Sequence, residues 1–149
     1  MANASTYLQN IFLKWLTQGT AAPVAPNPIY MSLHTADPAQ TGASEVSTTS
    51  TGYARVSVST TTASAIFGGA HVAGAAPAAN GTKQEVGNSA ILTFPSPTGT
   101  WGTCSFFGFW DAATAGDFLF GGPLTANIAP LSGGSAPTVA VGACLVDQQ

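Results

Sequence analysis

Two histidines, His34 and His71, are the only side chains in this sequence that could act as the neutral base of a covalent hydrolase. Such an enzyme holds a serine or cysteine nucleophile against its base, yet no serine lies in a Gly-x-Ser-x-Gly turn. His34 ends a predicted strand beside Thr35 and Asp37, where we expect the imidazole to bond to loop backbone. His71 lies among glycines and alanines. Neither histidine predicts catalysis.

The carboxylates could support acid–base or metal chemistry, but all of them fall in predicted loops or at strand ends. They are Asp37, Glu45, Glu85, Asp111, Asp117 and Asp147. Nothing in their spacing pairs two as glycoside hydrolysis requires. The segment between Asp111 and Asp117 lacks the alternating oxygen ligands of a calcium loop, so we predict that these two cap a turn. Cys104 and Cys144 have no nearby histidine to complete a zinc site. We therefore expect no catalytic residue, metal or cofactor, and no enzyme.

Two aromatic residues near predicted strand starts, Tyr53 and Trp101, are candidates for stacking against a sugar. Alternation along residues 53–59 directs Ala54 and Val56 inward and Tyr53 and Arg55 outward. Core packing is the favoured alternative for Trp101.

Charged residues make up only 6% of the chain, against about 25% in an average globular domain. We therefore expect a surface made largely of Ser, Thr, Ala, Gly and Asn. These short side chains lose little entropy when a partner covers them. This composition favours a subunit of a larger assembly. The alternative is an amino-acid bias of the source that has nothing to do with assembly.

The cations are Lys14, Arg55 and Lys83, and the formal net charge is −3. Phosphate binding needs clusters of Lys and Arg, so we expect no nucleic-acid partner. No apolar run approaches the roughly 20 residues of a membrane span, and no basic region precedes an apolar one as in a signal peptide. We expect no membrane association and folding in a cytoplasm, where Cys104 and Cys144 remain buried thiols rather than a disulfide.

Residues 1–19 predict an amphipathic helix. Thr6 and Gln9 fit a capping box, and Gly19 suits the position after the helix end. The apolar residues recur on one stripe, formed by Tyr7, Leu8, Ile11, Phe12, Trp15 and Leu16. We expect this stripe either to pack on the core of its own domain or to dock in a partner's groove.

Prolines 23, 26 and 28 predict an extended linker over residues 20–28. Residues 29–149 contain short apolar runs separated by turn residues, which predict an antiparallel β-sandwich or jelly-roll-like domain. The predicted strands cover residues 29–34, 53–59, 90–94, 101–110, 118–120, 124–128 and 138–146. For residues 60–87 we predict an irregular excursion, that is, a long loop outside the main sheets, with one short strand. The fold class is therefore mainly β with one N-terminal amphipathic helix.

The strands at 101–110 and 118–120 form the predicted central hairpin, because they hold five of the eight phenylalanines and two of the three tryptophans. Alternation places Trp101, Phe107 and Phe109 on one face of the first strand. It places Cys104, Phe106 and Trp110 on the other. We expect Gly121-Gly-Pro123 to break the sheet after the hairpin.

The order of several short motifs resembles a family of small tailed-bacteriophage virion proteins, variously labelled tail fibre, minor tail or decoration protein. The motifs are Ile29-Tyr-Met-Ser-Leu-His-Thr-Ala-Asp-Pro38, Gly52-Tyr-Ala-Arg-Val56, Ile91-Leu-Thr-Phe-Pro95, Gly99-Thr-Trp-Gly-Thr103, Phe107-Gly-Phe-Trp-Asp-Ala-Ala113 and Gly122-Pro-Leu-Thr125. The resemblance covers nearly the whole chain. The alanine-rich segment 63–85 and the two cysteines depart from it.

The resemblance implies a non-enzymatic virion structural protein, folded in the host bacterial cytoplasm. Our first expectation is a capsid decoration or cement protein that forms a homo-oligomer and packs against capsid subunits. The alternative is a neck, collar or tail accessory protein, including a fibre or baseplate part, and a second alternative is a glycan-binding receptor domain. The helical stripe would then supply assembly contacts, with residues 20–28 as the spacer.

Overall fold

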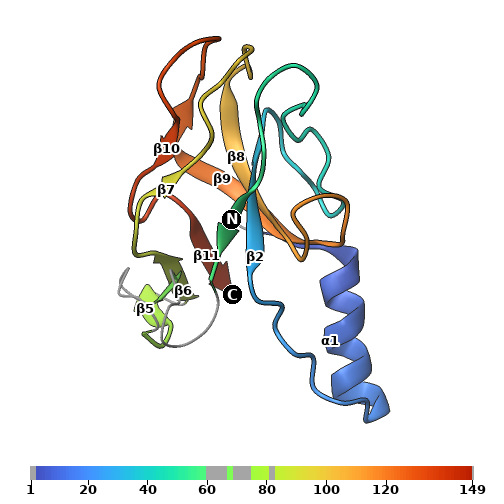
Figure 1. Ribbon diagram of the computed structural model, residues 1–149. Helices are drawn as coiled ribbons and strands as arrows, with labels where there is room; N and C mark the ends of the chain where they lie inside the picture. The colour runs from blue at the N-terminus through green and yellow to red at the C-terminus, as the bar shows by residue number, and fades with distance from the viewer. Residues whose placement is uncertain (1–2, 60–66, 69–74, 81–82, 149) are drawn as a thin grey trace.

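The computed structural model describes residues 3–59, 67–68, 75–80 and 83–148. It is mainly β, with one N-terminal helix and several antiparallel sheets (Figure 1), as the sequence predicts. His71 and parts of the excursion predicted over 60–87 lie outside the described residues.

The largest sheet has five strands in the order β1-β9-β8-β2-β3. Its members are β1 (Asn3–Ala4), β9 (Phe118–Ile128), β8 (Cys104–Trp110), β2 (Ile29–His34) and β3 (Val56–Val58). Every neighbouring pair is antiparallel. β2 has the predicted bounds, because a proline-rich segment precedes its apolar run and Asp37-Pro38 follows it.

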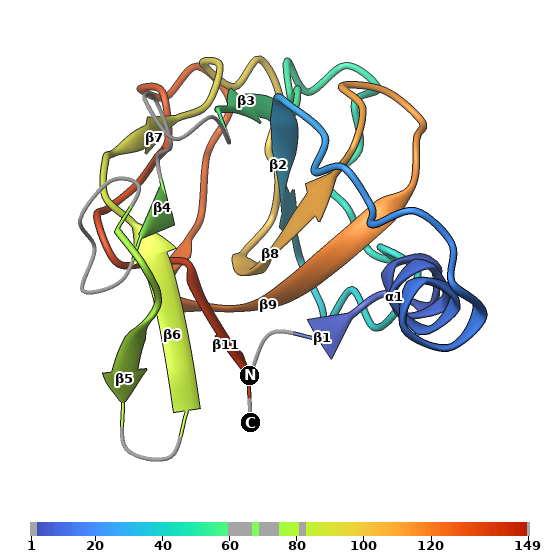
Figure 2. The same ribbon diagram turned by 90° about the horizontal axis from the view of Figure 1, so that it is seen from below.

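Two smaller sheets complete the part of the chain that follows the linker, residues 29–149, which we call the body. One contains β11 (Leu145–Gln148), β6 (Lys83–Asn88) and β4 (Phe67–Gly68), with β5 (Ala78–Asn80) also paired to β6. The other pairs β10 (Thr138–Val139) with β7 (Leu92–Thr93). Seen from below, β5 and β6 lie on the opposite side of the molecule from the helix (Figure 2). The predicted single last strand over 138–146 is therefore wrong, because a turn at Val141–Gly142 divides it.

β8 and β9 form the predicted central hairpin, with Phe107, Phe109 and Trp101 all in the core. Two details of the prediction are wrong. β9 continues through Gly121-Gly-Pro123, and Pro123 pairs with Phe106 where the register of the ladder is irregular. β8 begins only at Cys104, so Trp101 lies ahead of the strand although its ring is in the core.

The predicted strand over 53–59 begins only at Val56. Residues ahead of the ladder do not follow its alternation, so Tyr53 is buried and Ala54 is exposed, the reverse of the prediction. The described part of 60–87 contains β4, β5 and most of β6 rather than one short strand.

The helix α1 (Thr6–Gln18) begins one residue earlier than a capping box at Thr6 would place it. Its N-cap is Ser5, whose hydroxyl accepts a hydrogen bond from the Leu8 N–H. The Gln9 amide reaches back to the Ala4 carbonyl. Gly19 ends the helix with φ of 62°, a left-handed conformation that glycine adopts without strain, as predicted.

Candidate functional site

One polar cluster of the body is centred on Arg55. Its guanidinium binds both carboxylate oxygens of Glu45, at 2.9 and 2.8 Å, and donates to the carbonyls of Ala112 and Ala115 at 3.0 and 2.7 Å. It also lies 3.7 Å from the ring centroid of Trp110. The Arg55 side chain is only 9% exposed. With these partners it ties β3, β8 and the 111–117 turn together, and we read the cluster as structural.

His34 belongs to a buried chain of hydrogen bonds. Its Nδ1 lies 2.7 Å from the Ala43 carbonyl, which can only accept, so Nδ1 carries the proton. Nε2 then accepts from the Ser32 hydroxyl at 2.7 Å, and Ser32 accepts from the Trp110 indole N–H at 2.9 Å. Gly108 leaves room for this chain, because a Cβ there would lie 2.6 Å from Nε2. The predicted bond from His34 to loop backbone is confirmed.

Burial lowers the pKa of His34 below 6.5, and the Ala43 carbonyl and Glu45 oppose this shift only in part. The ring is fully buried. A neutral imidazole paired at both nitrogens and closed to solvent has no free position from which to activate a substrate.

Tyr53 and Trp101, the two candidates for sugar stacking, are each 4% exposed. They contact each other edge to face at 5.1 Å, and Tyr53 also stacks on Phe94. The Tyr53 hydroxyl donates to Glu45 and accepts from the Leu33 N–H, while the Trp101 indole donates to the Thr51 carbonyl. The core role favoured for Trp101 is confirmed. Neither ring presents an open face to a sugar.

Asp111 caps its turn as predicted, since its Oδ1 accepts the Asp117 N–H at 2.7 Å. Asp117 takes part through its backbone, and its carbonyl accepts the Asp111 N–H. Across the residues that the structure describes, no group of three His, Cys, Asp or Glu side chains could hold a metal. Cys104 and Cys144 are free and buried, in agreement with the prediction, and burial raises the pKa of the Cys104 thiol to about 11 and that of Cys144 further.

The short strand β1 and the helix α1 together form the arm, which we define as residues 3–19. No residue of α1 is buried. Its solvent side carries a group that we call the outer stripe, with exposed fractions in parentheses: Phe12 (51%), Leu13 (55%), Trp15 (38%) and Leu16 (66%). Phe12 and Trp15 contact each other edge to face at 5.3 Å. An apolar group of this size on a surface helix is typical of a contact surface.

The six predicted assembly residues are thus divided by the structure. Leu8 and Ile11 are half-buried on the side of the body, whereas Phe12, Trp15 and Leu16 remain exposed and Tyr7 lies at the border. Sequence reasoning missed Leu13. It lies outside the stripe that the spacing defines, and only the position of the body shows that its side chain is uncovered.

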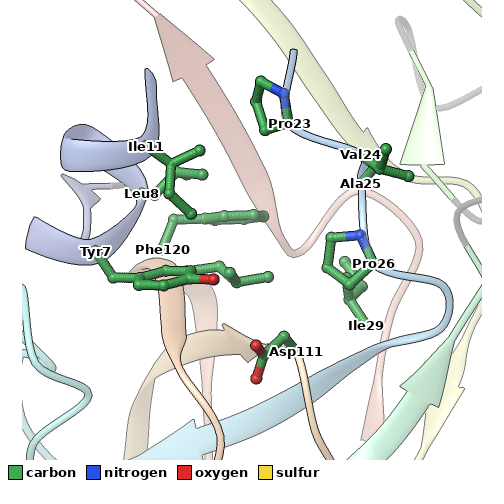
Figure 3. A pocket seen from close by; sticks show the side chains of 11 residues that line it. Tyr7, Leu8, Ile11, Pro23, Val24, Ala25, Pro26, Ile29, Asp111 and Phe120 are labelled. Carbon is green, nitrogen blue, oxygen red and sulfur yellow. The ribbon is translucent and has the colours of Figure 1, made fainter. Parts of the chain in front are cut away.

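A groove of about 410 Å³ separates α1 from the linker that follows it. Figure 3 shows Tyr7, Leu8 and Ile11 of the helix on one side and Pro23, Val24 and Pro26 on the other. Asp111 is the charged residue among those that line it. Slight burial and the nearby carboxylates of Asp117 and Asp111 raise the pKa of Tyr7.

Residues 3–147 match the model of the protein family described as "Podophage GP4 fiber I protein gp80". The chain belongs to this phage fibre family. The match includes the arm as well as the body. A comparison with curated proteins finds no match.

Membership of the fibre family confirms the resemblance to phage virion proteins and gives the chain a place in the virion. It supports the tail alternative better than capsid decoration, which receives no specific support. Among the described residues, no helix is long and apolar enough to cross a bilayer.

Proposed function

We propose that this protein is a structural part of the tail fibre apparatus, acting by assembly and without catalysis. The observation that carries the proposal is the outer stripe, an exposed apolar surface on a helix with no buried residue, in a chain of the fibre family. In this proposal Phe12, Leu13, Trp15 and Leu16 contact neighbouring virion subunits.

The body supplies a rigid base for this contact. Its buried polar groups bond to one another, as the Arg55 and His34 clusters show, so they are already partnered. Residues 20–28 act as a spacer between the anchor at 1–19 and the body at 29–149. Lys14 is the one charged residue of α1. A partner therefore covers the helix without desolvating an acidic group.

The location is tested by electron microscopy of intact virions with gold-conjugated antibody against this chain. Labels confined to the tail and its fibres support the proposal. Labels spread over the head would overturn it and restore the decoration reading.

The kind of contact is tested by salt. Because apolar burial is not screened, the assembled protein should stay on virions at high ionic strength. Release of the chain by moderate salt alone would contradict an apolar contact.

A further inference from the structure

The hydrogen bonds that fix the arm to the body lie at its beginning. β1 pairs Ala4 with Phe120 on the edge of β9. The Ser5 N–H donates to the Leu119 carbonyl at 2.8 Å, and the Thr6 hydroxyl donates to Gln40 Oε1 at 3.2 Å. Ser5 itself is 1% exposed. The body therefore contains a defined seat for the start of the arm, made by the β9 edge and Gln40.

The connection between the arm and the body is long and extended. Residues 20–25 are exposed and have no regular structure, and the linker contains three prolines. Nine extended residues span roughly 28 Å at about 3.1 Å each, more than the roughly 20 Å length of a 13-residue helix. A linker of this reach can carry the arm to a neighbouring molecule as easily as back to its own body.

The returning linker does not pack tightly on its own helix. Pro23, Val24 and Pro26 face Leu8 and Ile11 across the open groove of about 410 Å³ (Figure 3). Val24 is 91% exposed. The chain folds back at Gly19, yet part of the apolar surface stays open to solvent, since Leu8 and Ile11 are only half-buried. The hydrogen bonds to β9 and Gln40 fix where the start of the arm binds. The loosely packed linker does not fix which copy of the chain supplies that binding site.

We propose that the arm is exchanged between copies of this chain, so that residues 3–19 of one copy occupy the β9 seat of a second copy. The occupant is a second copy because the seat and the segment that fills it are both present in the structure. Exchange keeps every bond of Ala4, Ser5 and Thr6 to the body. It also frees the linker from its position opposite its own helix. The inference goes beyond the proposed function and does not rest on it.

Cross-linking of the arm to its seat distinguishes the two arrangements. Thr6 and Gln40 are exposed neighbours, so the double variant Thr6→Cys/Gln40→Cys places two reactive thiols at the seat. The purified protein is treated with a short bismaleimide and run on a denaturing gel. Exchange predicts covalent species of two or more chains. Adding a large excess of unmodified chain before refolding should remove these species, because each variant arm then meets an unmodified seat.

The controls are the unmodified chain and each single variant. Cys104 and Cys144 are buried and poorly ionised, so the unmodified chain should not react. Cross-links confined within single chains, and unaffected by the excess of unmodified chain, would overturn the inference. A monomeric mass by light scattering at micromolar concentration would overturn it as well. Either result leaves the virion location, tested by gold labelling, intact.

Discussion

In the body, the rings of Phe94, Phe107 and Phe109 are fully buried, whereas in the arm Phe12 and Trp15 face solvent. The charged groups differ in the same way. Arg55 is held by a carboxylate, two carbonyls and an indole ring, while Lys14 lies exposed on the helix. In the proposed function the body supplies stability and the arm supplies the contact surface. Substitutions should separate these two properties.

The largest effect is expected at Arg55. Arg55→Ala removes the counter-ion of Glu45, which keeps only the hydrogen bond from the Tyr53 hydroxyl. It also leaves two carbonyls without their donor and uncovers Trp110, so the free energy of unfolding should fall by about 3–5 kcal/mol. Urea denaturation measures the loss. Lys14→Ala is the matched control, since this exposed cation should change stability by less than about 0.5 kcal/mol. Equal stability of the two variants would remove the distinction between body and arm.

A smaller loss is expected at Ser32. Ser32→Ala deprives the Trp110 indole N–H and His34 Nε2 of their shared partner, and leaving such buried groups unpaired costs about 1–3 kcal/mol. Ser57→Ala, at an exposed position of β3, is the control and should melt like the unmodified protein. If Ser32→Ala also melts unchanged, the buried chain through His34 contributes no stability.

The third effect is a pH dependence of the body. Burial lowers the pKa of His34 below 6.5, so the unfolded chain binds a proton at a pH where the folded one does not. Stability is therefore complete above about pH 6.5 and falls as the pH drops toward the folded pKa. The slope is at most about 1.4 kcal/mol per pH unit.

Denaturation curves between about pH 7.5 and 5.5, above the ordinary carboxylate range, measure this slope. His34→Gln should flatten it. A slope that survives unchanged in His34→Gln would show that a different group is responsible.

The sequence was sufficient for elements bounded by strong local signals. β2 is an apolar run between proline and aspartate, and α1 ends at Gly19 as its spacing predicts. The pairing of the central hairpin was predicted as well, but not the end of β9, because Gly121-Gly-Pro123 does not interrupt it. The start of α1 was harder, because Ser5 and Thr6 can both cap a helix and only the bond from the Leu8 N–H decides between them.

The cluster around Arg55 could not be predicted, because its partners are distant in sequence and meet only when β3 lies on β2 and the 111–117 turn closes over Trp110. Tyr53 was misassigned for a related reason: the alternation rule holds only inside a paired strand, and β3 starts three residues later. For the arm, the apolar stripe was visible in the sequence. Which part of it faces solvent depends on how the helix lies on the body.

The most direct test of the division between body and arm is virion incorporation of a variant with a polar outer stripe. Leu13→Ser/Leu16→Ser should change the free energy of unfolding by less than about 1 kcal/mol, because both side chains are exposed. Asn10→Ser/Gln18→Ser, at exposed polar positions of the same helix, is the control. We predict that virions contain the control protein at the normal level and lack the stripe variant. Normal incorporation of a folded stripe variant would contradict the account.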